Sequence, residues 1–104
     1  MNLTRLPLPA LLAQWARSVD YVAREALTSA EFLADVDVRH EIATRVRGKP
    51  VTRETREMLT ELDEAFRTVT VEQATCLHGA SVAEANGWTP SREWYYWRSP
   101  VHAE

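Results

Sequence analysis

The sequence predicts an all-α fold, a small single-domain bundle of five to six short helices with an aromatic C-terminal tail. Apolar residues recur at three- and four-residue spacing over much of the chain, as they do on one face of a helix. Ser or Thr is repeatedly followed three residues later by Glu or Gln, the pattern of a helix capping box. The chain of 104 residues has only three glycines and five prolines, too few for the turns of an all-β sandwich, and its length suits one domain over residues 1–104.

The N-terminal half is expected to form three helices. The first runs from about Pro9 to Ala26 and is amphipathic. Thr28-Ser29-Ala30-Glu31 then has capping-box form and begins a second helix. We expect this helix to be short, because Asp35-Val36-Asp37 interrupts the apolar spacing. A third helix, from about Val38 to Arg47, should end at Gly48, since a left-handed backbone costs glycine nothing.

The C-terminal half is expected to add shorter helices. Thr52 caps a helix that extends to about Arg67. Two further capping boxes, Thr70 with Gln73 and Ser81 with Glu84, predict short helices near Val71–His78 and Val82–Asn86. The β-branched run Val69-Thr70-Val71 is also compatible with a strand, but it is isolated in the sequence.

Charge is unevenly distributed along the chain. Between Arg39 and Arg56, six Lys and Arg residues stand against two Glu residues, so this stretch carries +4 and the rest carries −7 of a total of −3. A local excess of this size creates a field that the overall net charge conceals. It favours an anionic ligand. The alternative is a solvated surface on which the arginines pair with neighbouring glutamates and contribute little.

Residues 27–59, LTSAEFLADVDVRHEIATRVRGKPVTRETREML, resemble a divergent phage-repressor-like (XRE/Cro-type) helix-turn-helix. The resemblance is carried by the opening Leu27-Thr28, by the segment from Ile42 to Pro50 and by the Thr-capped helix that follows. The turn departs from the family pattern, since it lacks the usual glycine, is one residue short and contains two aspartates. The resemblance implies a bacterial or phage-type regulator that binds double-stranded DNA as a dimer and has no enzymatic activity.

The family geometry also implies which residues would contact DNA. The second helix of such a motif enters the major groove, and the loop and helix that follow contact phosphates. The base-contact candidates are Arg39, His40, Thr44 and Arg45. The phosphate-contact candidates are Arg47, Lys49, Thr52, Arg53 and Arg56.

The aromatic tail, residues 88–97, suggests a rival function. Trp and Tyr are enriched at protein interfaces because they bury a large area and keep a polar group. The partner-surface candidates are Trp88, Trp94, Tyr95, Tyr96 and Trp97. The rival is a non-enzymatic protein-interaction module, such as an inhibitor, an antitoxin-like partner or an assembly adaptor. The tail could instead seal the core or line a small-molecule pocket.

Residues for catalysis or metal binding are sparse. Asp35, Asp37 and His40 offer three ligands without a fourth, and the pair Cys76 and His78 has no partner pair. The sequence contains no glycine-rich phosphate loop and no nucleophile elbow. We therefore expect no catalytic site, no metal and no cofactor. One cysteine favours a reducing compartment, and no window approaches the ~20 apolar residues of a membrane span, so we expect a cytoplasmic protein without a membrane segment.

Overall fold

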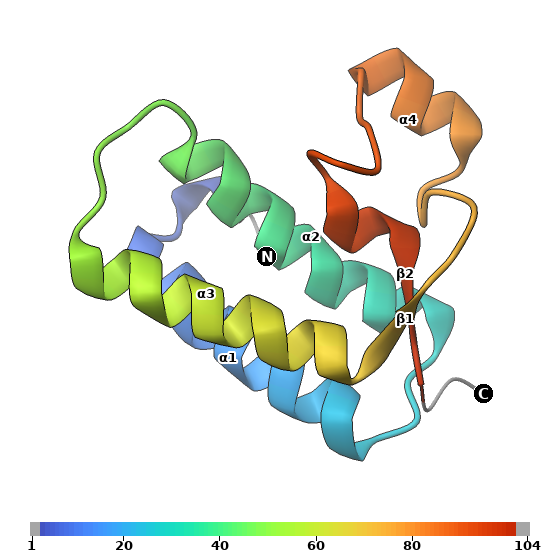
Figure 1. The fold of residues 1–104 in the computed structure, drawn as a ribbon, viewed down its shortest axis with the longest axis horizontal. Coiled ribbons are helices and arrows are strands. Elements are labelled where there is room, and N and C mark those ends of the chain that lie inside the picture. The colour runs from blue at the N-terminus through green and yellow to red at the C-terminus, as the bar shows by residue number, and fades with distance from the viewer. Residues whose placement is uncertain (1–2, 102–104) are drawn as a thin grey trace.

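The computed structural model describes residues 3–101. The chain is mostly helical, as predicted, but it is not all-α, because two short strands near the C-terminus pair with each other (Figure 1). The elements in chain order are η1 (Leu3–Arg5), α1 (Leu8–Arg24), α2 (Ser29–Val46), α3 (Arg53–Thr68), β1 (Thr70–Glu72), α4 (Ala80–Asn86), η2 (Trp94–Trp97) and β2 (Arg98–Pro100). Within the described residues there are only four α-helices, besides two 3-10 helices of a single turn each. The prediction of five to six short helices is therefore wrong.

The predicted break at Asp35-Val36-Asp37 is wrong, because α2 runs unbroken from Ser29 to Val46. Val36 is fully buried and continues the apolar face of the helix. The two aspartates do not end the helix, since each has a partner elsewhere in the fold. Asp35 accepts a hydrogen bond from Ser18 Oγ at 3.0 Å, and Asp37 binds two side chains from the C-terminal half. The turn that a helix-turn-helix needs at this position is therefore absent.

The predicted caps around α2 and α3 are confirmed. Thr28 Oγ1 accepts from the N–H of Glu31, and the Glu31 carboxylate accepts from the N–H of Thr28. Gly48 follows the end of α2 with φ of +69°, the left-handed conformation expected there. Thr52 Oγ1 then caps α3 by accepting from the N–H of Thr55 at 3.1 Å. These local signals fix where the loop between α2 and α3 begins and ends.

The helix predicted near Val71–His78 is wrong. Residues 70–72 form β1, which pairs antiparallel with β2 in the register Thr70 with Pro100 and Glu72 with Arg98. The Thr70 hydroxyl donates backward to the carbonyl of Phe66 at 2.8 Å and so does not cap a new helix. The next helix, α4, is present as predicted, but Gly79 precedes it and no side chain caps it.

The core is built around α1, which packs against both α2 and α3. Trp15 of α1 is fully buried, with its ring centroid 5.0 Å from that of Phe66 on α3. The tail folds across the other side of α2 and adds Tyr95 and Tyr96, each 1% exposed, to the core (Figure 1). No helix within residues 3–101 is both long and apolar enough to cross a bilayer.

Candidate functional site

Arg39, predicted to contact a DNA base, lies in the core. Its Nε donates to Asp63 Oδ1 at 2.9 Å and its Nη2 to Asp63 Oδ2 at 3.0 Å, with 8% of the residue exposed. Trp15 Nε1 donates to the same Asp63 at 3.2 Å. The guanidinium also lies over the Tyr95 ring, 5.2 Å from its centroid. Arg39 therefore does not project from an exposed helix face, because a carboxylate on α3 holds it inside.

His40, the second base-contact candidate, is also turned toward the interior. Its Nδ1 shares a hydrogen bond of 2.8 Å with the Tyr95 hydroxyl. Its ring meets the Trp88 ring edge-on, with centroids 5.0 Å apart. Burial, with a further contribution from Arg47, lowers the pKa of His40 below its ordinary value, although nearby carboxylates oppose this shift. His40 is therefore a packing residue, and its burial favours the neutral form of the ring.

Thr44 and Arg45 are closer to the surface, but Arg45 is already bound. Its Nε donates to Glu41 at 2.8 Å, one turn earlier on α2. Its Nη2 donates to the carbonyls of Leu3 and Thr4 at 3.1 and 2.7 Å, which fixes η1 against α2. Thr44 is exposed, but its hydroxyl donates to the backbone one turn back. The four base-contact candidates therefore do not form an open reading face.

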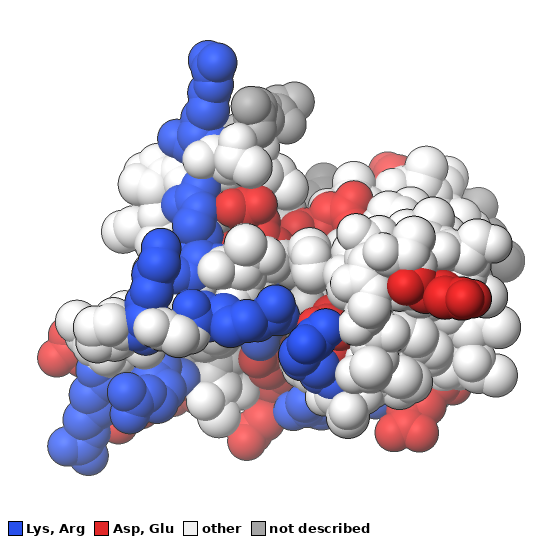
Figure 2. All heavy atoms as spheres, turned by 90° about the horizontal axis from the view of Figure 1, so that it is seen from above, with Lys and Arg blue, Asp and Glu red and all other residues white. Residues whose placement is uncertain are grey.

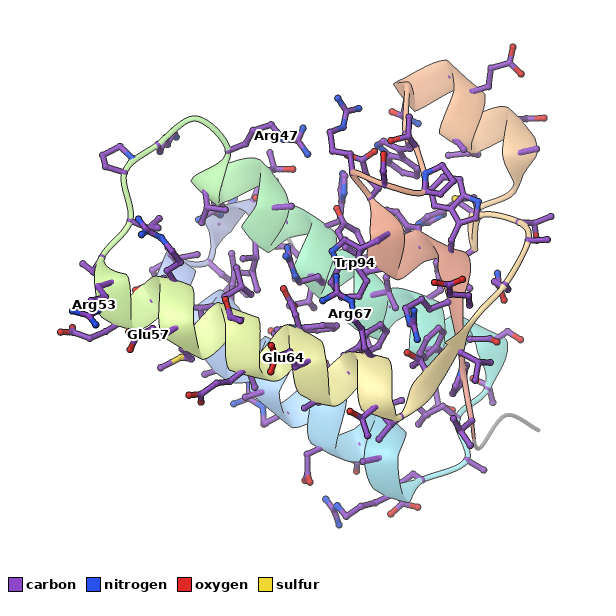
Figure 3. All side chains as sticks on the ribbon, in the orientation of Figure 1. Arg47, Arg53, Glu57, Glu64, Arg67 and Trp94 are labelled. Carbon is purple, nitrogen blue, oxygen red and sulfur yellow. The ribbon has the colours of Figure 1, made fainter. Side chains whose placement is uncertain are left out.

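The phosphate-contact candidates, by contrast, are all exposed and surround the loop between α2 and α3. Arg47 is at the end of α2, and Arg53 is beside Glu57 at the start of α3 (Figure 3). Arg53 Nε donates to Glu57 at 3.0 Å on an open surface. Lys49 and Arg56 form no salt bridge with a carboxylate of the described residues. The Thr52 hydroxyl is engaged in capping α3.

Arg92, which sequence reasoning missed, joins Arg47 through Glu93. Arg92 Nε and Arg47 Nη2 lie 2.6 and 3.2 Å from the same oxygen, Glu93 Oε2, while the Glu93 side chain is fully buried. Burial alone would raise the pKa of Glu93. The N–H of Thr89 and the two arginines outweigh burial and lower this pKa. Two half-exposed guanidiniums, 45 residues apart in the sequence, are thus clamped side by side.

We group six exposed cationic residues under the name basic face: Arg5, Arg47, Lys49, Arg53, Arg56 and Arg92. Arg5 belongs to η1, which Arg45 ties to α2. Figure 2, seen from above relative to Figure 1, shows Lys and Arg side chains gathered over one part of this side of the molecule. The part of this view farther from them is mostly uncharged, with some acidic side chains. No local pattern in the sequence indicates that Arg92 lies beside Arg47.

The tail does not form the predicted partner surface as a whole. Tyr95 and Tyr96 are core residues, and burial is the main reason that the pKa of Tyr95 rises to about 12. The Tyr96 hydroxyl donates to Asp37 Oδ1 at 2.7 Å, and the Trp88 ring stacks on Tyr96 with centroids 4.7 Å apart. Trp88, Trp94 and Trp97 are half-buried. The alternative in which the tail folds back and seals the core accounts for the two tyrosines.

The residues considered as metal ligands are engaged separately. Asp35 binds Ser18, while Asp37 binds both His78 and Tyr96. Within residues 3–101 no three His, Cys, Asp or Glu side chains gather as a metal site would require. Comparison with models of known protein families, with curated proteins and with solved structures finds no match. The surface and the packing of this chain are therefore the basis for its function.

Proposed function

We propose that this protein is a non-catalytic nucleic-acid-binding domain that contacts the phosphate backbone through its basic face. The proposal rests on two observations. Lys and Arg side chains gather on one side of the molecule (Figure 2). Arg47, beside the exposed cations of the loop after α2 and the start of α3, is joined to Arg92 of the tail through Glu93. The stretch from Arg39 to Arg56 carries +4 and the rest of the chain carries −7, so a polyanion is attracted mainly to the region of the loop after α2. Phosphate contact is sequence-independent and supplies most of non-specific affinity.

The proposal differs from a helix-turn-helix regulator in how the nucleic acid would be held. Arg39 is buried on Asp63 and the half-buried His40 ring is bound to Tyr95, and so base reading by α2 has no support from the packing. The basic face is contained in one chain, so binding does not require the dimer that the resemblance implied. Two of the six cations share Glu93 and one pairs with Glu57, which leaves three without a carboxylate partner among the described residues.

The rival function, a protein-interaction module that uses the aromatic tail, is less well supported. Tyr95 and Tyr96 are 1% exposed and already have hydrogen-bond partners inside the fold. A partner could reach only the half-buried tryptophans. The basic face does not depend on the tail except through Arg92 and Glu93.

A matched pair of double variants tests the proposal. Lys49→Ala with Arg56→Ala removes two cations from the basic face without leaving a described carboxylate unpaired. Arg17→Ala with Arg24→Ala removes the same charge from α1. Binding to a labelled 20-nucleotide strand or duplex is measured by fluorescence anisotropy at low salt. We expect a loss of about tenfold or more for the first pair and little change for the second. Equal losses of affinity in both double variants would show that only the net charge of the protein matters, and would refute a defined binding face.

A further inference from the structure

A second surface feature lies where the end of α3 meets the tail. A cavity of about 350 Å³ opens there, and its walls include Arg67, Pro90, Trp94, Trp97 and Arg98. Binding pockets in proteins usually have volumes of roughly 300 to 1,000 Å³, so this cavity suits a small group and not a large ligand. Figure 3 shows Arg67 and Trp94 together between α3 and the tail. None of these residues takes part in the basic face.

Arg67 and Trp94 form a flat, charged wall of this cavity. The Arg67 guanidinium lies 3.8 Å from the centroid of the Trp94 ring, which is a stacking distance. Phe66 meets the same indole edge-on, with centroids 6.0 Å apart, and so fixes its orientation. Arg67 is exposed and forms no salt bridge with a carboxylate of residues 3–101. Its outer face is therefore open to a planar group or to a phosphate.

Trp97 also lines the cavity and differs from the other three tryptophans. Trp15, Trp88 and Trp94 each have a ring neighbour, whereas Trp97 has none within the described part of the chain. Its backbone is fixed, because the carbonyl of Trp97 accepts from the N–H of Gln73 at 3.0 Å. A half-buried indole that is not covered by another ring can stack against a bound base.

Arg98 keeps the remaining wall rigid. Its Nε donates to Thr70 Oγ1 at 2.7 Å, and its Nη2 donates to the carbonyls of Thr70 and Arg67 at 3.0 and 3.2 Å. Its side chain is 13% exposed, so it contributes positive potential more than direct contact. Glu72, 89% exposed at the rim and 4.0 Å from Arg98, is the opposing charge.

We propose that this cavity takes one base of a single-stranded nucleic acid, stacked on Trp97 with Arg67 beside it. This inference rests on the proposed function and names its ligand class. Bases stack readily on aromatic rings and on the guanidinium planes of arginine. The tail connects the cavity with the basic face. Pro90 lines the cavity, and Arg92, two residues later in the chain, is one of the six cations of that face. A strand with one base in the cavity could place neighbouring phosphates on that face.

The test compares three labelled ligands by fluorescence anisotropy: a 15-nucleotide thymidine strand, an abasic strand of the same length, and a 15-base-pair duplex. The abasic strand keeps the phosphates and lacks the bases. The wild type should bind the thymidine strand about 5- to 150-fold more tightly than the abasic strand, the range measured for one stacked base. Trp97→Ala should remove this preference and leave abasic binding unchanged, while Trp97→Phe should restore part of it.

Two further variants separate stacking from folding and from charge. Arg67→Lys keeps the charge and loses the plane, so it should weaken binding of the thymidine strand more than binding of the abasic strand. Tyr21→Ala, which removes a ring 54% exposed on α1, should change neither affinity. If thermal melting shows that Trp97→Ala does not fold, Trp97→Phe and Arg67→Lys test whether a base stacks in the cavity.

The outcomes distinguish this inference from the proposed function. Equal wild-type affinity for the thymidine and abasic strands would overturn the base site and leave phosphate binding in place. Failure to bind any of the three ligands would overturn both. Tighter binding to the duplex than to the thymidine strand would also overturn the base site. Displacement of the thymidine strand by a proline-rich decapeptide, but not by thymidine monophosphate, would assign the cavity to a peptide.

Discussion

Replacing Asp63 with alanine would remove a carboxylate that links three helices through the core. Asp63 on α3 accepts two hydrogen bonds from Arg39 on α2 and one from Trp15 on α1, at 2.9, 3.0 and 3.2 Å. Without it, the Arg39 guanidinium would stay buried with no counter-charge. Arg39 Nη1 already has no partner within the described residues, so little compensation is available. Breaking a buried ion pair on one side typically costs about 3–5 kcal/mol.

Urea unfolding followed by tryptophan fluorescence measures this cost. With a denaturant slope of about 1.5 kcal/mol per molar for a domain of this size, the midpoint of Asp63→Ala should fall by about 2–3 M. Replacing both partners, Arg39→Met with Asp63→Leu, should recover most of the loss, because no charge is then left unpaired. Glu57→Ala is the control, since the Arg53–Glu57 pair is exposed and its loss should leave the midpoint nearly unchanged. A midpoint for Asp63→Ala within about 0.5 M of wild type would refute the reasoning.

Three smaller effects follow from the same structure. Burial lowers the pKa of His40, so that below pH ~6.5 the unfolded chain takes up a proton at this residue before the folded chain does. The free energy of unfolding should therefore fall from pH 7 to pH 5. His40→Gln should make this fall smaller in urea titrations. Thr28→Ala removes half of a capping box and should cost about 1 kcal/mol in the same assay, and an unchanged midpoint would contradict the cap. Gly48→Ala places a side chain at φ of +69°, where no atom beyond the two chain neighbours lies within 4 Å of the new Cβ. Its cost of about 1–2 kcal/mol should therefore come from the backbone alone and should be smaller for Gly48→Asn.

Features of the fold that depend on neighbouring residues could be predicted from the sequence. The Thr28 and Thr52 caps and the left-handed Gly48 are correct because each involves groups only a few residues apart. The expectation of a mostly helical chain follows from the same local periodicity. These signals do not depend on where the rest of the chain lies, so they hold before the fold is known.

Features that depend on distant partners could not be predicted. Asp35 and Asp37 were expected to end a helix, but Ser18, His78 and Tyr96 satisfy them from other elements. Thr70 was expected to cap a helix, but its pairing with Pro100 makes it part of a strand. Tertiary packing overrides local propensity in these places.

In the candidate site, too, the features set by neighbouring residues could be predicted and those set by distant partners could not. The exposed cations from Arg47 to Arg56 follow from charge counting along the chain, whereas the burial of Arg39 depends on Asp63, 24 residues away. Arg92 joins Arg47 only because Glu93 is buried between them in the folded chain. Charge patterning thus indicates which stretch is basic, and only the fold indicates which of its residues face outward.

The salt dependence of single-strand binding tests the central claim most directly. For a strand held by four to six phosphate contacts, the slope of log K against log salt concentration should be about −3 to −4. Lys49→Ala with Arg56→Ala should make this slope less negative by about 1.4, and Arg17→Ala with Arg24→Ala should leave it unchanged. A wild-type slope near zero, or equal slopes in the two double variants, would contradict the claim that the basic face binds the phosphate backbone.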